Sequence, residues 1–241
     1  GGRPAVAAGG FRRRLNPHPK QPTSLIEMGF ERPQLKQLWA RGYHRQRMLD
    51  LRIQQHFIDS ADLHYQVAET LAKPVDAAVQ AVLASVTGGG KVLVGGMGSS
   101  SALAQYLVNL LVGGFERDRP GLAAVCLSSD ALMATRWSDG QALAKQILAL
   151  GQTGDVLVLI STDGSEAALV QAAQAAHERE MSVLALTGHQ GGALGRQLRE
   201  TDVHVCVPHE RAARICEVQH LVLHCLCDGI DTQLLGEQEP L

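Results

Sequence analysis

The sequence predicts an α/β fold in which helices cover both faces of a parallel, doubly wound (Rossmann-like) sheet of about five strands. Two strand-like apolar runs, 92–94 and 155–160, are each followed by a turn rich in glycine and serine and then by an Ala-rich helical stretch. Similar units recur at roughly 30-residue spacing, as in parallel sheets. With 241 residues, of which 45% are hydrophobic and 19% charged, the chain can form one main domain with a full core.

Composition excludes several classes of function. A formal net charge of −2 gives no basic surface for direct binding of nucleic acid or an anionic membrane. The sequence contains no apolar run of about 18 residues, which argues against a membrane span. Its five cysteines form no Cys-x-x-Cys pair, so we expect reduced core thiols in a cytoplasmic protein.

The N-terminal part divides into two segments. Residues 1–47 are basic and rich in Gly, Pro, Arg and Gln, without sustained periodicity, so we predict a poorly ordered basic extension. An arm that contacts nucleic acid is the less favoured alternative, and no apolar stretch indicates a secretory signal. Residues 48–86 show helical spacing with a predicted break at Lys73-Pro74, where Pro74 starts a second helix. The main domain is predicted over 87–235, with a tail over 236–241.

The main domain contains further predicted elements. The strands are 121–127, 155–160, 182–186 and 204–207 after the first at 92–94, and the helices are 142–150, 167–176 and 211–235. Because parallel strands end at one edge of the sheet, the Ser, Thr and Gly residues that follow them are expected to meet in one crevice.

The first strand–helix turn is a candidate anion site. Gly96, Gly98, Ser99 and Ser100 precede a helix whose first backbone N–H groups are unpaired, and small side chains let a ligand approach them. Its spacing matches neither a dinucleotide-binding nor a P-loop motif. An ordinary tight turn is the alternative interpretation.

Several motifs occur together in one order: 96–100 with Ala104-Gln105, then 161–164, 186–188 and 214–217. With these motifs, the chain resembles the SIS (sugar isomerase) domain family. The resemblance extends from about Met48 to the C-terminus. The subgroup that it resembles contains phosphoheptose isomerase and DiaA, a protein that associates with the initiator DnaA. The resemblance implies N-terminal helices that bury their apolar face against a neighbouring subunit, and a homo-oligomer, expected to be a tetramer.

The resemblance also implies a catalytic pattern from which this chain departs. Phosphoheptose isomerases interconvert a ketose phosphate and an aldose phosphate through an enediol, which requires a carboxylate base and a paired acid. The family pattern Ala-Gln-His-Phe-Ala-Ala-Glu aligns with 104–110, so its Glu position is Leu110 and its His, a metal ligand in zinc-bound members, is Tyr106. Leucine cannot accept a proton. We therefore expect no catalytic residues, with Glu217 and His224 as remnants.

The closing helix gives only weak candidates for a metal site. Cys216 and His224 occupy two positions that the resemblance assigns to metal ligands, but they lie about 12 Å apart along a helix. His220 could pair with Cys216 across one turn. Core or interface residues are the favoured interpretation, and no zinc or other cofactor is expected.

The second turn also differs from the family pattern, which reads Ser-Thr-Ser-Gly-Asn-Ser or Ser-Thr-Arg-Gly-Asn-Ser. Here 161–166 carries Asp163 and Glu166, whose charges would repel a phosphate dianion, so weak or absent sugar-phosphate binding is predicted. Ordinary helix capping is the alternative role of these acids. The candidates for sugar-phosphate binding are Gly98, Ser99, Ser100, Asp130, Ser161, Thr162 and Ser165.

The C-terminus favours a different function. Residues 225–231, followed by Leu234-Leu235, resemble the end of DiaA, where an exposed apolar pair contacts the initiator. Residues 116–120 also resemble DiaA and are expected to form a solvated turn. The prediction is a non-catalytic regulator that binds DnaA through Leu234 and Leu235 and promotes its assembly at the replication origin; subunit packing is the other role for this pair. The alternatives are a phosphoheptose (sedoheptulose 7-phosphate) isomerase that uses Glu217 and His224, or a sugar-phosphate-binding SIS protein.

Overall fold

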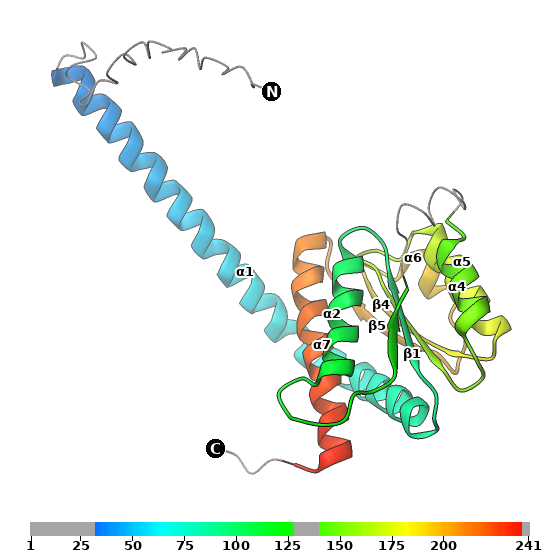
Figure 1. Ribbon diagram of the computed structural model, residues 1–241. Coiled ribbons are helices and arrows are strands. Elements are labelled where there is room, and N and C mark those ends of the chain that lie inside the picture. The colour runs from blue at the N-terminus through cyan, green and yellow to red at the C-terminus, as the bar shows by residue number, and fades with distance from the viewer. Residues whose placement is uncertain (1–31, 128–139, 238–241) are drawn as a thin grey trace, which may run out of the picture. The chain divides into compact units, whose positions relative to one another are not determined.

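The computed structural model describes residues 32–127 and 140–237 (Figure 1). The chain falls into two units, Gly1–Gln55 and His56–Leu241. The second unit contains a five-stranded parallel sheet in the order β2-β1-β3-β4-β5, which confirms the predicted fold class. Its strands are β1 (Val92–Gly96), β2 (Ala124–Cys126), β3 (Val156–Ile160), β4 (Ser182–Gly188) and β5 (Val203–Val207).

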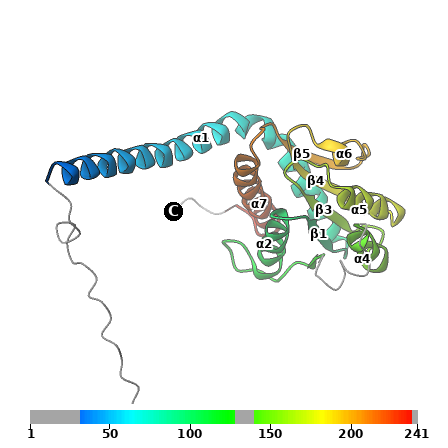
Figure 2. The same ribbon diagram turned by 90° about the horizontal axis from the view of Figure 1, so that it is seen from above.

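Helices cover both faces of this sheet (Figures 1 and 2). They are α1 (Arg32–Thr87), α2 (Ser100–Gly113), α4 (Ala142–Leu150), α5 (Ala167–Glu178), α6 (Gly192–Gly195) and α7 (Ala212–Leu235). Because successive strand side chains point to opposite faces, Val92 and Val94 pack with α2, α7 and the part of α1 after His56, whereas Leu93 packs with α4 and α5. Among the described residues, no helix combines the length and the apolar composition that a membrane crossing requires.

Helix α1 differs from the prediction at two places. It begins at Arg32, inside the segment predicted as an extension up to residue 47, and Pro33 suits a first helical turn. The predicted break at Lys73-Pro74 is wrong, because the helix continues through Pro74. A proline inside a helix removes one backbone hydrogen bond and bends the axis, and α1 changes direction within the second unit (Figure 1).

Part of the apolar face of α1 is covered by its own domain. Leu63, Leu71 and Val82 are buried in the core that α1 shares with the sheet. The expectation that a neighbouring subunit buries this face can therefore apply only to the residues that remain exposed in the single chain. Phe57 and Tyr65 remain 75% and 87% exposed.

In the segment 116–120, Glu116, Asp118 and Pro120 are exposed, as the predicted solvated turn requires, but Arg119 departs from that prediction. Arg119 is buried, and its Nε lies 2.5 Å from Oδ1 of Asp231 on α7. The guanidinium also donates to the carbonyls of Leu110 and Leu111 near the end of α2, at 3.2 and 2.8 Å. The five donors of an arginine can satisfy a carboxylate and a helix end together, which explains its burial.

Candidate active site

The turn between β1 and α2 brings Ser99 to the start of a helix. A Cβ atom on Gly96 would lie 2.5 Å from the carbonyl oxygen of Ser100, so only glycine fits there. Gly98 has φ +56°, a conformation that favours glycine. Ser100 is buried, whereas Ser99 is exposed and its hydroxyl caps no backbone group. The turn therefore presents the Ser99 hydroxyl to its surroundings.

The ends of the central strands meet at one edge of the sheet, as expected. Gly96 is in register with Ile160, and Ile160 with Leu186. The turns that follow β1, β3 and β4 consequently start side by side. Asp130 lies outside the described residues.

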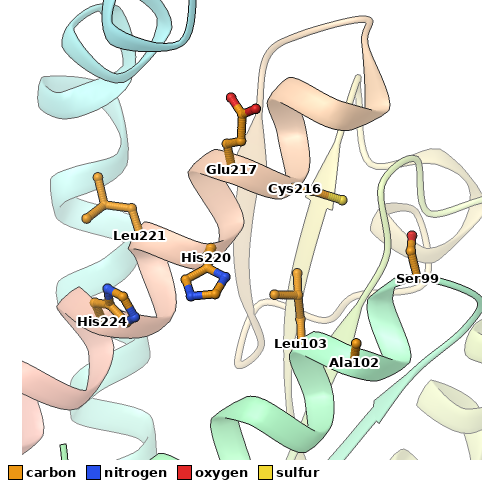
Figure 3. Close-up of a pocket in the computed structure, with 8 residues that line it drawn as sticks. All are labelled: Ser99, Ala102, Leu103, Cys216, Glu217, His220, Leu221 and His224. Atoms are coloured by element: carbon orange, nitrogen blue, oxygen red, sulfur yellow. The ribbon is translucent and has the colours of Figure 1, made fainter. Parts of the chain in front are cut away.

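A pocket of about 560 Å³ lies between α2 and α7 (Figure 3). Its lining residues are Ser99, Ala102 and Leu103 from the α2 side and Cys216, Glu217, His220, Leu221 and His224 from α7. The α7 residues recur at spacings of three and four, so they occupy one face of that helix. The pocket unites Ser99 with Glu217 and His224, but its lining includes none of Ser161, Thr162 and Ser165.

The carboxylate of Glu217 is held by two donors. Ser60 Oγ donates to its Oε2 at 2.7 Å, and Arg214 Nη2 donates to its Oε1 at 2.5 Å. The second guanidinium nitrogen, Nη1, donates to the carbonyl of His56 at 2.6 Å. These bonds join α7 to α1 within the domain and fix the direction of the Glu217 side chain.

A ring cluster surrounds His224. Tyr106 Oη lies 2.8 Å from His224 Nε2. The ring centroid of His220 is 4.6 Å from that of Tyr106 and 4.9 Å from that of His224, and Phe115 lies 5.2 Å from His224. Burial, and then the charge of His224, lower the pKa of His220, which keeps its imidazole neutral at neutral pH.

The residues present do not fit a zinc ion. Tyr106, at the position of a metal-binding His in the family pattern, is hydrogen-bonded to His224, and Leu110, at the position of the family's catalytic Glu, is buried hydrocarbon with no group to offer a metal. Burial is the main cause of a raised pKa at Cys216, whose thiol therefore stays protonated at neutral pH. Within the described ranges, no group of three His, Cys, Asp or Glu residues is placed to hold a metal. The weak candidates Cys216, His220 and His224 share the pocket without forming such a group.

The turn after β3 is bonded to its own carboxylates. Ser161 Oγ donates to Glu166 Oε2 at 2.6 Å and accepts from the N–H of Gly164 at 2.7 Å. Asp163 Oδ1 accepts from the N–H and from the hydroxyl of Ser165, at 2.9 and 2.8 Å. These two hydrogen bonds are the main cause of the lowered pKa of Asp163. Each carboxylate therefore bonds a hydroxyl of the same turn.

Three supporting residues were not found from the sequence. The pair Arg214 and Glu217 has the i,i+3 spacing of a helical ion pair, so a local signal was present. Ser60 lies 157 residues from Glu217 and carries no such signal. Gln219 is fully buried and donates to the carbonyls of Ser161 and Leu186, at 2.6 and 3.3 Å, which anchors α7 to the strand ends.

Comparisons with known proteins identify the family of the chain. Residues 55–188 match the SIS domain family. The chain is 56% identical over 196 residues to a phosphoheptose isomerase of Methylibium petroleiphilum, covering 80% of this chain and 98% of that protein. It is 49% identical over 192 residues to a phosphoheptose isomerase of Azoarcus sp., covering 78% and 98%.

Solved structures give the same result. Phosphoheptose isomerase GmhA of Neisseria gonorrhoeae has a TM-score of 0.70 at 39% identity, covering 76% of this chain and 99% of that chain. A phosphoheptose isomerase of Francisella tularensis has a TM-score of 0.72 at 38% identity, covering 77% and 98%.

These similarities correct the main functional prediction. The interpretation as a non-catalytic, DiaA-like regulator of DnaA is wrong, because the relatives in sequence and structure are phosphoheptose isomerases. Leu234 and Leu235, predicted as the DnaA contact, end α7 with 38% and 41% of their surface exposed. That degree of exposure does not identify a partner. The chain belongs to the SIS domain family, and it is similar in sequence and in fold to phosphoheptose isomerases.

Proposed function

We propose that this protein is an aldose–ketose isomerase of phosphorylated sugars, with sedoheptulose 7-phosphate as the substrate to test first. The observation that carries the proposal is that Glu217 and His224 line one pocket of about 560 Å³ beside the first strand–helix turn. The similarity to phosphoheptose isomerases supports this substrate class.

The reaction moves one proton between adjacent carbons and another between their oxygens. In our proposal the Glu217 carboxylate takes the proton from the carbon beside the carbonyl and returns it to the former carbonyl carbon. His224 gives a proton to the carbonyl oxygen and recovers one from the neighbouring hydroxyl, so that the imidazole ends unchanged. The two residues are seven positions apart, a rise of about 10 Å, with both side chains at the pocket.

The proposal differs from the mechanism that the resemblance implies. Leu110 is buried and has no group that can take a proton, so the base must come from elsewhere. Glu217 is the acidic residue among those that line the pocket, and Ser60 and Arg214 fix its direction. Our proposal therefore assigns the role of the base to a carboxylate on α7 instead of one on α2.

A second candidate function is binding of a sugar phosphate without turnover. Leu110 is the observation that favours it, because the family base is absent from α2. The carboxylates that occupy 161–166 predict weak binding in this case, since they oppose a phosphate dianion.

One experiment separates the two functions. Purified protein is incubated with sedoheptulose 7-phosphate, the products are followed by NMR, and binding is measured by calorimetry. Turnover that Glu217→Gln reduces at least 100-fold supports the isomerase, since a general base contributes about 10²–10⁴. Glu178→Gln, an exposed change on α5, is the matched control. Saturable binding without turnover would favour the second function. If the protein neither binds nor converts the sugar phosphate, both proposed functions are wrong.

Assembly is part of the proposal. Phe57 and Tyr65 leave large exposed rings on α1, as expected if a second copy covers this face. A homotetramer is the expected state.

A further inference from the structure

We infer that Tyr106 is a positioning residue for His224, donating its phenolic proton to Nε2 and thereby fixing the imidazole as the Nδ1–H tautomer. Its catalytic consequence rests on the proposed isomerase function. The tautomer itself rests on the geometry alone and can be measured without substrate.

The two side chains come from different helices, and His224 is the one that lines the pocket. Tyr106 lies on α2 and His224 on α7, with Oη and Nε2 2.8 Å apart. The rings of His220 and Phe115 pack against this pair, at centroid distances of 4.6 Å from Tyr106 and 5.2 Å from His224.

The direction of the hydrogen bond follows from acid–base chemistry. A neutral imidazole has one N–H donor and one nitrogen acceptor, so its partner determines which nitrogen carries the proton. A phenolic hydroxyl is a stronger hydrogen-bond donor than a neutral imidazole N–H, and an imidazole nitrogen accepts better than a phenol oxygen. Tyr106 therefore donates and Nε2 accepts.

This assignment leaves the other nitrogen of His224 as the donor. Nδ1 of His224 has no hydrogen-bond partner among the described residues, and His224 lines the pocket. A neutral Nδ1–H group can donate to the carbonyl oxygen of a sugar and take a proton back from the adjacent hydroxyl. With the opposite tautomer, Nδ1 would be an acceptor and could not begin this exchange.

The experiment measures the tautomer directly. Nitrogen-15 NMR of protein labelled at histidine reports which ring nitrogen carries the proton, and His224→Gln identifies the signals of this residue. We expect the Nδ1–H tautomer of His224 in the unmodified protein. Finding the proton on Nε2 there would overturn the inference without any variant.

A variant tests the cause. Tyr106→Phe keeps the ring and removes the hydroxyl, so His224 is expected to shift toward the Nε2–H tautomer. In sedoheptulose 7-phosphate assays kcat is expected to fall about tenfold with KM within about twofold, as for one lost hydrogen bond in catalysis. Tyr65→Phe, the same change at an exposed position of α1, is the matched control.

The outcomes distinguish the two proposals. An unchanged tautomer in Tyr106→Phe would contradict the inference, even if turnover fell. Absence of turnover in the unmodified protein would contradict the isomerase proposal, while the NMR measurement would still decide the role of Tyr106.

Discussion

At the scale of single residues, two positions one turn apart on α2 depart from the pattern that the family resemblance implies. Leu110 is packed in the core, and Tyr106 is hydrogen-bonded to His224. Neither provides the carboxylate and imidazole that the family resemblance implies on this helix. The groups able to exchange protons come mainly from α7, where Glu217 and His224 line the same cavity.

Asp231 on α7 is predicted to be one of the residues most sensitive to substitution. It is 1% exposed and pairs with Arg119, whose side chain is equally buried. Asp231→Ala leaves a buried guanidinium without its carboxylate, so we expect the free energy of unfolding to fall by about 3–5 kcal/mol. Urea denaturation measures the change, with the exposed Asp228→Ala as control. A loss below about 1 kcal/mol would contradict the prediction.

Cys227 predicts a dependence of stability on pH. Burial is the main cause that raises the pKa of its thiol to about 12. An unfolded thiol ionises near pH 8.5, so between about 8.5 and 12 the unfolded chain loses a proton that the folded chain keeps. The free energy of unfolding should therefore fall as pH rises through this range, and less steeply in Cys227→Ala. Urea titrations at pH 8, 9 and 10 test this; equal slopes in the two proteins would count against it.

At the scale of elements, the turn between β1 and α2 depends on Gly96. A Cβ atom added at Gly96 would lie 2.5 Å from the carbonyl oxygen of Ser100. This carbonyl cannot move without disturbing the start of α2. Gly96→Ala is expected to lower the free energy of unfolding by about 1–3 kcal/mol and to weaken ligand binding. Gly113→Ala, on the same helix, has nothing within 4 Å of the added atom and should be neutral or stabilising. Thermal unfolding of Gly96→Ala and Gly113→Ala tests this difference. Equal unfolding midpoints would argue against the close approach of residue 96 to the backbone of Ser100.

The elements show how far local sequence determines the fold. Apolar runs and glycine turns placed the five strands, and helix 142–150 was predicted with the bounds observed for α4. Pro74 was misjudged because core contacts of residues such as Leu71 and Val79 hold α1 together on both sides. Arg119 was misjudged because its partner, Asp231, lies 112 residues away. Interactions of this range leave no periodic pattern in a sequence.

The candidate site follows the same rule. The motifs named Glu217 and His224 only as remnants of a catalytic pattern; both line the pocket, and the strand ends meet where parallel topology requires. The bond between Tyr106 and His224 spans 118 residues, and that between Ser60 and Glu217 spans 157. Both depend on how α7 packs against α2 and α1, which spacing alone does not determine.

At the scale of the whole molecule, exposed rings on α1 predict assembly. Phe57→Glu places a charge on a side chain that is 75% exposed in one chain but would be covered in an oligomer. We expect this variant to sediment as a smaller species than the unmodified protein in analytical ultracentrifugation. Gln66→Glu adds a carboxylate at a polar exposed position of the same helix and should leave the mass unchanged. An unchanged mass in Phe57→Glu would indicate that this face is not an interface.

The bonds between Ser161 and Glu166, and between Ser165 and Asp163, have a consequence for ligand recognition. To bind these two hydroxyls, a phosphate ester would have to displace carboxylates of the same turn. Because the carboxylates belong to the same chain, their effective concentration at the hydroxyls is much higher than that of a dissolved ligand. Discrimination among sugars would then depend more on the carbon skeleton than on the ester. Glu166→Ser removes one of the competing carboxylates, so inorganic phosphate should become a measurable inhibitor of sedoheptulose 7-phosphate turnover.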